Sequence, residues 1–142
     1  MARYGATLTL PTITGSHAGF AALLTNGSFP AAAIDGGATS ILNGGGNLRA
    51  YTNSLKGTQF PVETVKFVTG TSPQINVRVA VTAQTSATIY IEADTVATVQ
   101  PAVTGTYGRN SVWAANEMFS HFETSTPIDS SGNLNSPVYT GT

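Results

Sequence analysis

The sequence predicts an all-β protein in which antiparallel strands form a sandwich or a barrel. Apolar and polar residues alternate with a period of two in many short runs, and Gly, Pro and Asn residues separate these runs. The runs are rich in Thr, Val and Ile, which favour strands. The 142 residues are enough for one domain with a substantial core, and we expect at most one short helix in it.

The first half of the chain contains three predicted strands. The first covers 6–10 and ends before a proline. The second, 20–25, is closed by the turn dipeptide Asn26-Gly27. The Ala-rich segment 30–34 fits either a helix or a strand, and a further strand covers 48–52 after a Gly-rich loop.

The middle of the chain holds the clearest strands. A strand-like run covers 62–70, and the run 75–82 alternates throughout, with apolar side chains on one face. A strand follows at 88–93, and the link 83–87 has the length of a hairpin loop. We also expect a short strand at 96–99.

Two details of the later chain bear on the site. In the strand 88–93, alternation directs Ile89 and Ile91 into the core and Tyr90 and Glu92 toward solvent. The segment 112–122 fits a helix, because two of its polar residues are four apart, but part of it also alternates as a strand does.

The most unusual property of the composition is its low charge. Only 9% of the residues are charged, against about 25% in ordinary domains, and Thr, Ser, Asn, Gly and Ala take their place. Such a surface suits a subunit that packs against neighbours, or one that meets uncharged partners such as sugars. The net charge of −1 and the scattered basic residues argue against nucleic acid as a partner.

The sequence also limits membrane and disulfide chemistry. No apolar stretch approaches the ~20 residues of a spanning helix, so we expect no membrane partner. The absence of cysteine excludes disulfides and thiolate metal sites. The N-terminus lacks the apolar core of a signal peptide, and we expect the chain to be made in a reducing host cytoplasm.

Short motifs follow one another in a fixed order along the chain. They are Ser16-His17-Ala18-Gly19-Phe20, the Gly-rich turn and strand 44–52, Phe60-Pro61-Val62-Glu63-Thr64-Val65, the strands 75–81 and 88–91, and 108–113 with His121 and 129–133. Over residues 16–135 they resemble the uncharacterised concanavalin/laminin-G lectin-like domain family of bacterial surface, phage and archaeal proteins. The resemblance implies a lectin-like, jelly-roll β-sandwich with a strand at 118–122, and it brings no catalytic residues.

The chain departs from that family in places. Asn47 stands where the family has an acid, and Ala50 where it has an aromatic residue. The sequence also ends where the family continues into a second domain, so we expect a stand-alone module. We divide it into an N-terminal strand or arm (1–15), a β-sandwich domain (16–135) and a C-terminal arm (136–142).

Two sets of residues are candidates for a site. Arg49 and Glu63 are expected to form a buried or half-buried pair, which fixes geometry or takes part in binding. Five aromatic residues could stack on sugars, lie in an interface or be buried. They are Tyr4, Tyr51, Tyr90, Tyr107 and Trp113.

Metal binding is not expected. The candidate ligands are His17, His121, Glu117 and Glu123, but only Glu117 and His121 have ligand spacing, and two ligands do not make a zinc site. The segment 129–133 has a single acid and is better explained as a turn than as a calcium loop.

Catalysis is not expected either. Glu92 and Asp94 could be a glycosidase pair, but a solvated strand edge explains them better. The chain contains no nucleophile-elbow, Walker or dinucleotide motif. We therefore expect no catalytic, cofactor or metal residues, and no enzyme.

Together these observations favour a structural role in a virion. We expect a capsid decoration (cement) protein on the head exterior of a tailed bacteriophage, which bridges capsid subunits. Its partners would be the major capsid protein or another virion protein and further copies of itself, with a trimer favoured. The segments 1–13 and 137–142 would be arms that add strands to neighbours. The alternatives are a lectin-like module that binds surface glycans and a component of the tail or fibre.

Overall fold

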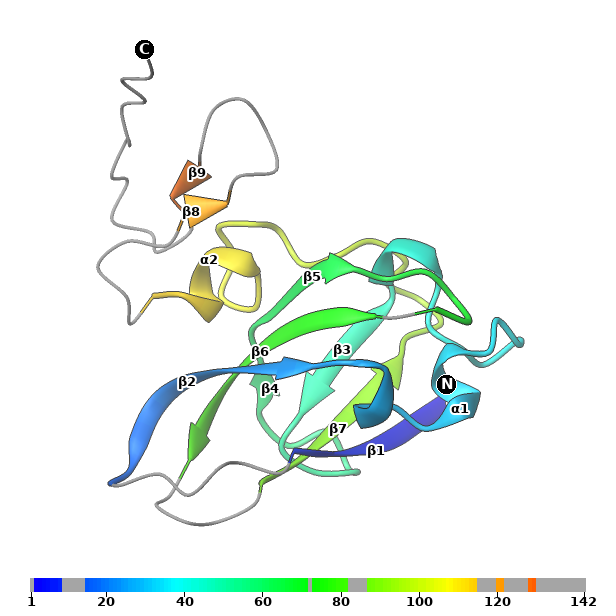
Figure 1. Ribbon diagram of the computed structural model, residues 1–142, viewed down its shortest axis with the longest axis horizontal. Helices are drawn as coiled ribbons and strands as arrows, with labels where there is room; N and C mark the ends of the chain where they lie inside the picture. Colours follow the sequence, from blue (N-terminus) through cyan, green and yellow to red (C-terminus); the bar gives the residue numbers. More distant parts are fainter. Residues whose placement is uncertain are drawn as a thin grey trace.

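Residues 2–8, 15–71, 73–81, 87–114, 120–121 and 128–129 are described by a computed structural model of the chain (Figure 1). Within these ranges most elements are strands in antiparallel sheets. The two α-helices, α1 (Ala31–Ile34) and α2 (Arg109–Val112), have four residues each. The prediction of an all-β protein is therefore confirmed, although it allowed one helix and the structure has two.

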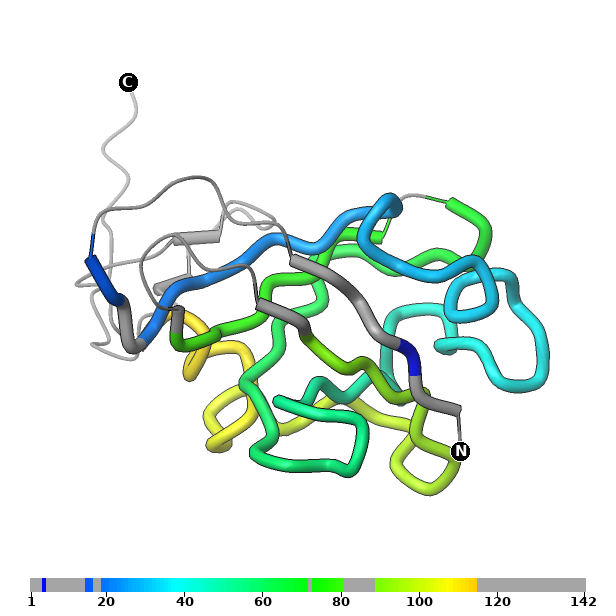
Figure 2. The backbone as a smooth tube through the Cα atoms, turned by 90° about the horizontal axis from the view of Figure 1, so that it is seen from below, coloured from blue at the N-terminus to red at the C-terminus, as the bar shows by residue number. Residues whose placement is uncertain are grey.

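The larger sheet has four strands in the order β1-β7-β3-β4. They are β1 (Ala2–Leu8), β7 (Ala87–Ala93), β3 (Leu48–Tyr51) and β4 (Gln59–Phe60). β1 pairs with β7 from Ala2 opposite Ala93 to Leu8 opposite Ala87, so its first residues lie beside the loop that follows β7. Figure 2 shows that loop, in yellow-green, from below. This part of the expected N-terminal arm is thus an edge strand of the chain's own sheet.

A second sheet has three strands in the order β2-β6-β5. They are β2 (His17–Leu24), β6 (Gln74–Val81) and β5 (Val62–Lys66). The predicted hairpin between the strands now called β6 and β7 is wrong, because they belong to different sheets. Each already has a strand on both sides, so the link between them passes from one sheet to the other.

Both sheets contribute side chains to one hydrophobic core. In β6 the side chains of Ile75, Val77 and Val79 are buried while Ala80 is exposed, as the alternation predicts. Ile89 and Ile91 of β7 are also buried, as predicted. The rings of Phe29 and Phe67 meet edge to face with their centroids 6.2 Å apart. The core is made up of Ala22, Leu24, Phe29, Ala33, Ile41, Leu48, Ala50, Val62, Phe67, Ile75, Val77, Val79, Ile89, Ile91 and Ala93.

The chain after β7 differs from the prediction. The run 96–99 is a loop and not a strand, because the Asp94 carboxylate accepts the main-chain N–H groups of Val96 and Ala97 and closes a turn. Further on, α2 is followed by a small sheet of β8 (Ser120–His121) and β9 (Ile128–Asp129). β8 agrees with the strand implied at 118–122, while residues 115–119, 122–127 and the expected C-terminal arm lie outside the described residues.

Candidate functional site

Arg49 is buried and binds main-chain oxygens. Its Nη1 donates to the carbonyl oxygens of Gly46 and Leu48, at 3.0 and 2.6 Å, and its Nη2 donates to that of Val99 at 2.8 Å. The guanidinium therefore fastens the loop that follows β7 to the start of β3. None of these bonds reaches Glu63, which lies on a strand of the other sheet.

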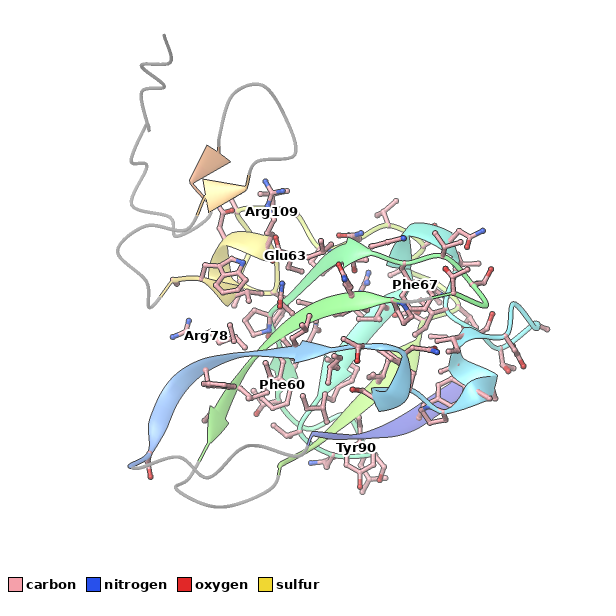
Figure 3. All side chains as sticks on the ribbon, viewed as in Figure 1. Phe60, Glu63, Phe67, Arg78, Tyr90 and Arg109 are labelled. Carbon is pink, nitrogen blue, oxygen red and sulfur yellow. The ribbon has the colours of Figure 1, made fainter. Side chains whose placement is uncertain are left out.

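Glu63 is also buried, but it belongs to a second network. Its Oε2 accepts hydrogen bonds from Asn76 Nδ2 at 3.0 Å and from Trp113 Nε1 at 2.8 Å. Close by, Arg78 Nη1 donates to the carbonyl oxygen of Ser111 at 3.2 Å, and α2 lies over this part of β5 and β6 (Figure 3). The expected Arg49–Glu63 pair is thus replaced by two separate networks, one of which anchors α2.

Glu92 is buried, which contradicts the predicted solvated strand edge. Its side chain is 0% exposed, and its Oε1 lies 2.7 Å from Lys56 Nζ. The loop 52–58 is closed by a hydrogen bond from the Thr52 N–H to the Thr58 carbonyl oxygen and supplies this lysine. Alternation placed Glu92 on the face away from the core correctly, but it could not show that this loop covers that face.

Lys56 has a strained backbone and a shifted pKa. Its φ of 58° lies in the left-handed region, which is unfavourable for a residue with a side chain. The hydrogen bond to Glu92 raises the pKa of the Lys56 ammonium. The ammonium also lies 5.8 Å from the centre of the Tyr51 ring, and burial raises the pKa of the Tyr51 hydroxyl.

The five predicted aromatic residues do not form one platform. Tyr51 and Tyr90 are neighbours on β3 and β7, and Tyr90 projects from the larger sheet in Figure 3. Tyr4 donates through its hydroxyl to the Thr39 carbonyl oxygen and Oγ1, at 2.9 and 3.1 Å. Tyr107 is exposed, while Trp113 is half-buried against Glu63.

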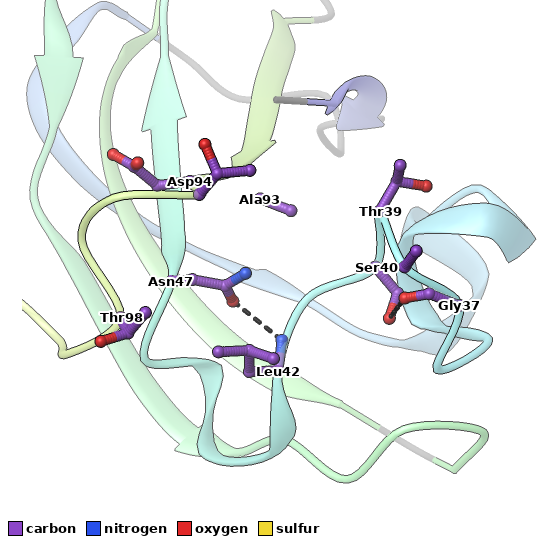
Figure 4. A pocket seen from close by; sticks show the side chains of 10 residues that line it. Gly37, Thr39, Ser40, Leu42, Asn47, Ala93, Asp94 and Thr98 are labelled. Carbon is purple, nitrogen blue, oxygen red and sulfur yellow. Dashed lines mark hydrogen bonds between the residues drawn. The ribbon is translucent and has the colours of Figure 1, made fainter.

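A pocket of about 400 Å³ opens between the loop after α1 and the loop after β7 (Figure 4). Leu42 and Ala93 give it apolar walls, and Thr39 and Thr98 add hydroxyl groups. Asn47 lies at its base, and its Oδ1 accepts the N–H of Leu42 at 2.8 Å. Because a main-chain N–H can only donate, this bond fixes the orientation of the amide and leaves Nδ2 facing the pocket.

Asp94 lines the same pocket and is ionised at neutral pH. Its Oδ1 accepts the N–H groups of Val96 and Ala97 at 2.8 and 3.2 Å, and its own N–H donates to the Asn47 carbonyl oxygen at 2.8 Å. The hydrogen bond from the Val96 N–H lowers the pKa of the Asp94 carboxyl. Sequence reasoning missed this pocket, since its residues come from separate segments of the chain.

Metal and membrane sites find no support in the described part of the chain. No three of its His, Asp and Glu side chains could hold a metal ion together. Glu117, Glu123 and the side chains of His17 and His121 lie outside the described residues, as does most of 129–133. None of the described helices has the length and apolar character to cross a membrane.

Exposed apolar side chains gather on three adjoining segments. Nine large hydrophobic side chains are exposed among the described residues, and seven of them lie on or next to the 3-10 helix η2 (Asn43–Gly45), β5 and the loop 94–108. We call these seven the apolar edge. They are Leu42, Val65, Val68, Val96, Val99, Val103 and Tyr107.

Hydrogen bonds hold these three segments side by side. The Gly44 N–H donates to the Phe67 carbonyl oxygen at 2.7 Å, and Gln100 Nε2 donates to the Gly44 carbonyl oxygen at 2.6 Å. The Val62 N–H donates to the Tyr107 carbonyl oxygen at 3.0 Å. The loop residues 95–108 include no Asp, Glu, Lys or Arg, so this part of the edge combines exposed apolar groups with a lack of charge.

No family model, no curated protein and no solved structure matches the chain. The resemblance to the lectin-like domain family therefore stays a prediction.

Proposed function

We propose that the chain is a jelly-roll, lectin-like β-sandwich that serves as a structural protein of a tailed bacteriophage. Its place would be the exterior of the head, where it acts as a capsid decoration protein. The partner would be the major capsid protein or another virion protein, and the chain would assemble there as a homo-oligomer, most simply as a trimer on a capsid symmetry axis.

The apolar edge is the observation that carries this proposal. Val96 is 85% exposed and Val99 is 74% exposed, so both side chains gain by burial against a partner. Exposed apolar side chains that gather on adjoining segments mark interaction sites in proteins that otherwise cover such groups. The partner surface that faces the loop 95–108 would also be poor in charge, because a charged group there would lose its water without finding a counter-charge.

The geometry of the edge fits a bridging role. Its segments are fixed by main-chain hydrogen bonds and by the Arg49 guanidinium, so little conformational entropy would be lost on binding. A contact of about 1,600 Å² in total is enough for a stable complex. Binding across a junction of two capsid subunits would join them and stiffen the shell.

A binding experiment with matched variants tests this function. The purified chain is mixed with heads assembled without it, and the bound fraction is measured after sedimentation. We expect saturable binding of the wild type. The double variant Val96→Lys/Val99→Lys should bind at least about tenfold more weakly, which corresponds to about 1.4 kcal/mol, because each lysine would have to leave water at the contact.

The control is the double variant Leu23→Lys/Leu55→Lys. Leu55 is 86% exposed, as much as Val96, and Leu23 is 53% exposed, yet both lie outside the apolar edge. We expect this variant to bind like the wild type. Absence of binding by the wild type, or an equal loss in both double variants, would contradict the proposal. Binding to tails in place of heads would favour the tail or fibre alternative.

A further inference from the structure

The pocket beside Asn47 contains a hydrogen-bond donor, the Nδ2 of this residue, that no described residue satisfies. Asn47 is 5% exposed, and its Oδ1 is occupied by the Leu42 N–H. Among the described residues none accepts a hydrogen bond from Nδ2, and Figure 4 shows this atom turned toward the space between Ala93 and Thr39. A ligand oxygen that enters the pocket can therefore accept a hydrogen bond from this group.

The walls around this donor suit a small apolar group. Leu42 and Ala93 line the pocket with methyl and methylene groups. Thr39 lines the pocket and adds a hydroxyl group, whose oxygen lies 3.1 Å from the Tyr4 hydroxyl oxygen. The pocket therefore combines an apolar surface with the donor of Asn47.

The charges around the pocket favour a neutral ligand. The lining includes the ionised carboxyl group of Asp94, which disfavours anions. The amide N–H₂ of Asn47 needs an acceptor, and an ammonium or guanidinium group offers only donors. A neutral group that offers an acceptor oxygen next to a methyl group meets all these conditions.

We propose that this pocket binds an acetamido group, independently of the proposed structural function. The carbonyl oxygen accepts from Asn47 Nδ2, and the methyl group contacts Leu42 and Ala93. The volume of about 400 Å³ is at the small end of ligand pockets and has room for one sugar ring or one amino-acid unit. An N-acetylated sugar and an N-acetylated peptide both carry this group.

Titrations of the isotope-labelled full chain, followed by NMR chemical shifts, test the proposal. The probes are N-acetylglucosamine, N-acetylalanine methylamide and, as a sugar that lacks the acetamido group, glucose. We expect at least one acetamido probe to shift the signals of Asn47, Ala93 and Thr98 saturably, with a dissociation constant in the millimolar range, and glucose to leave them unchanged. The acetamido probe that binds with the lower dissociation constant shows whether the natural ligand is an N-acetylated sugar or an N-acetylated peptide.

Variants at the base and the mouth of the pocket make the test specific. Asn47→Asp keeps an acceptor for the Leu42 N–H but replaces the donor with a second acceptor, and should weaken binding at least about tenfold. Ala38→Trp fills the mouth from an exposed position and should abolish binding even if Asn47→Asp disturbs folding. Ala80→Trp, at an exposed position on the other sheet, should bind normally.

Three results would overturn this assignment. One is the absence of saturable binding by both acetamido probes. Another is unchanged binding in Ala38→Trp. The last is equal shifts with glucose, which would mean that the acetamido group is not recognised.

Discussion

Lys56 Nζ lies 2.7 Å from Oε1 of Glu92, a carboxylate whose side chain is fully buried. Taking a carboxylate out of water is costly, and an ammonium at this distance offsets much of that cost. The loop 52–58 therefore does more than connect β3 to β4, because it delivers the cation that Glu92 requires.

Replacing Lys56 with methionine should destabilise the fold. The ammonium has a raised pKa, so its contribution is fully present below the ordinary lysine pKa of about 10.4 and is lost as the pH rises through the higher folded value. Urea unfolding should show a lower free energy of unfolding for Lys56→Met at pH 8, and a smaller difference from the wild type above pH ~11. Lys66→Met, on the exposed end of β5, is the control and should change stability by less than about 0.5 kcal/mol. Equal effects of the two variants would contradict the role of this ion pair.

Asp94 should stabilise the loop of the apolar edge in an acid-sensitive way. Its lowered pKa means that its contribution is present above the ordinary aspartate value of about 3.9 and is lost as the pH falls through the folded value. Asp94→Ala should lower the free energy of unfolding by about 1 kcal/mol at pH 7. This value is at the low end for the loss of two hydrogen bonds to a carboxylate, because the Asp94 side chain is half-exposed. Asp94→Asn keeps an acceptor oxygen, and its stability should vary less than that of the wild type between pH 5 and pH ~2. Thermal unfolding of the wild type and the two variants across this pH range measures both effects. If the stability of Asp94→Asn varied with pH as much as that of the wild type, the acid-sensitive role of the Asp94 turn would be contradicted.

Trp113 should be the residue that fastens α2 to the smaller sheet. Its Nε1 donates to the buried Glu63 carboxylate at 2.8 Å, and a hydrogen bond to a charged group contributes about 1.5–3 kcal/mol. Trp113→Phe should lower the free energy of unfolding by about this amount, measured by circular dichroism. Tyr107→Phe, at an exposed ring, should stay within about 0.5 kcal/mol of the wild type. If Trp113→Phe left the free energy of unfolding unchanged, α2 would have to be held by other contacts.

Gly46 should tolerate no side chain. A Cβ atom at this position would overlap the carbonyl oxygen of Thr98, so the loop after β7 would have to move away. Gly46→Ala should cost about 1–3 kcal/mol. At Gly27 a Cβ atom would meet nothing within 4 Å, and Gly27→Ala should be close to neutral. Urea denaturation of the two variants compares them directly, and similar stabilities would show that the loop is not packed against Gly46.

Local pattern predicted the strands and their buried faces, but not which strands pair. Alternation is a property of neighbouring residues, so the inward positions of β6 and β7 could be read from the sequence. Pairing depends on contacts between distant segments, such as β1 with β7. The short link before β7 has hairpin length, yet both flanking strands have their neighbours elsewhere.

The site could be predicted only in part for a related reason. Arg49 and Glu63 are both buried, as expected of a buried pair. Their partners could not be predicted, because Arg49 binds main-chain carbonyls, which every residue carries, and one of them belongs to Val99, 50 residues away. The sequence marked Asn47 only as a departure from a family pattern and not as a site residue, although it lies at the base of the pocket.

Cryo-electron microscopy of particles assembled from the genome that encodes this chain tests the central claim most directly. The account predicts density for the chain on the head exterior, at junctions between capsid subunits, with Val96 and Val99 buried in the contact. Purified particles that contain no copy of the chain would contradict it. Particles in which the apolar edge faces solvent while other surfaces make the contacts would contradict it as well.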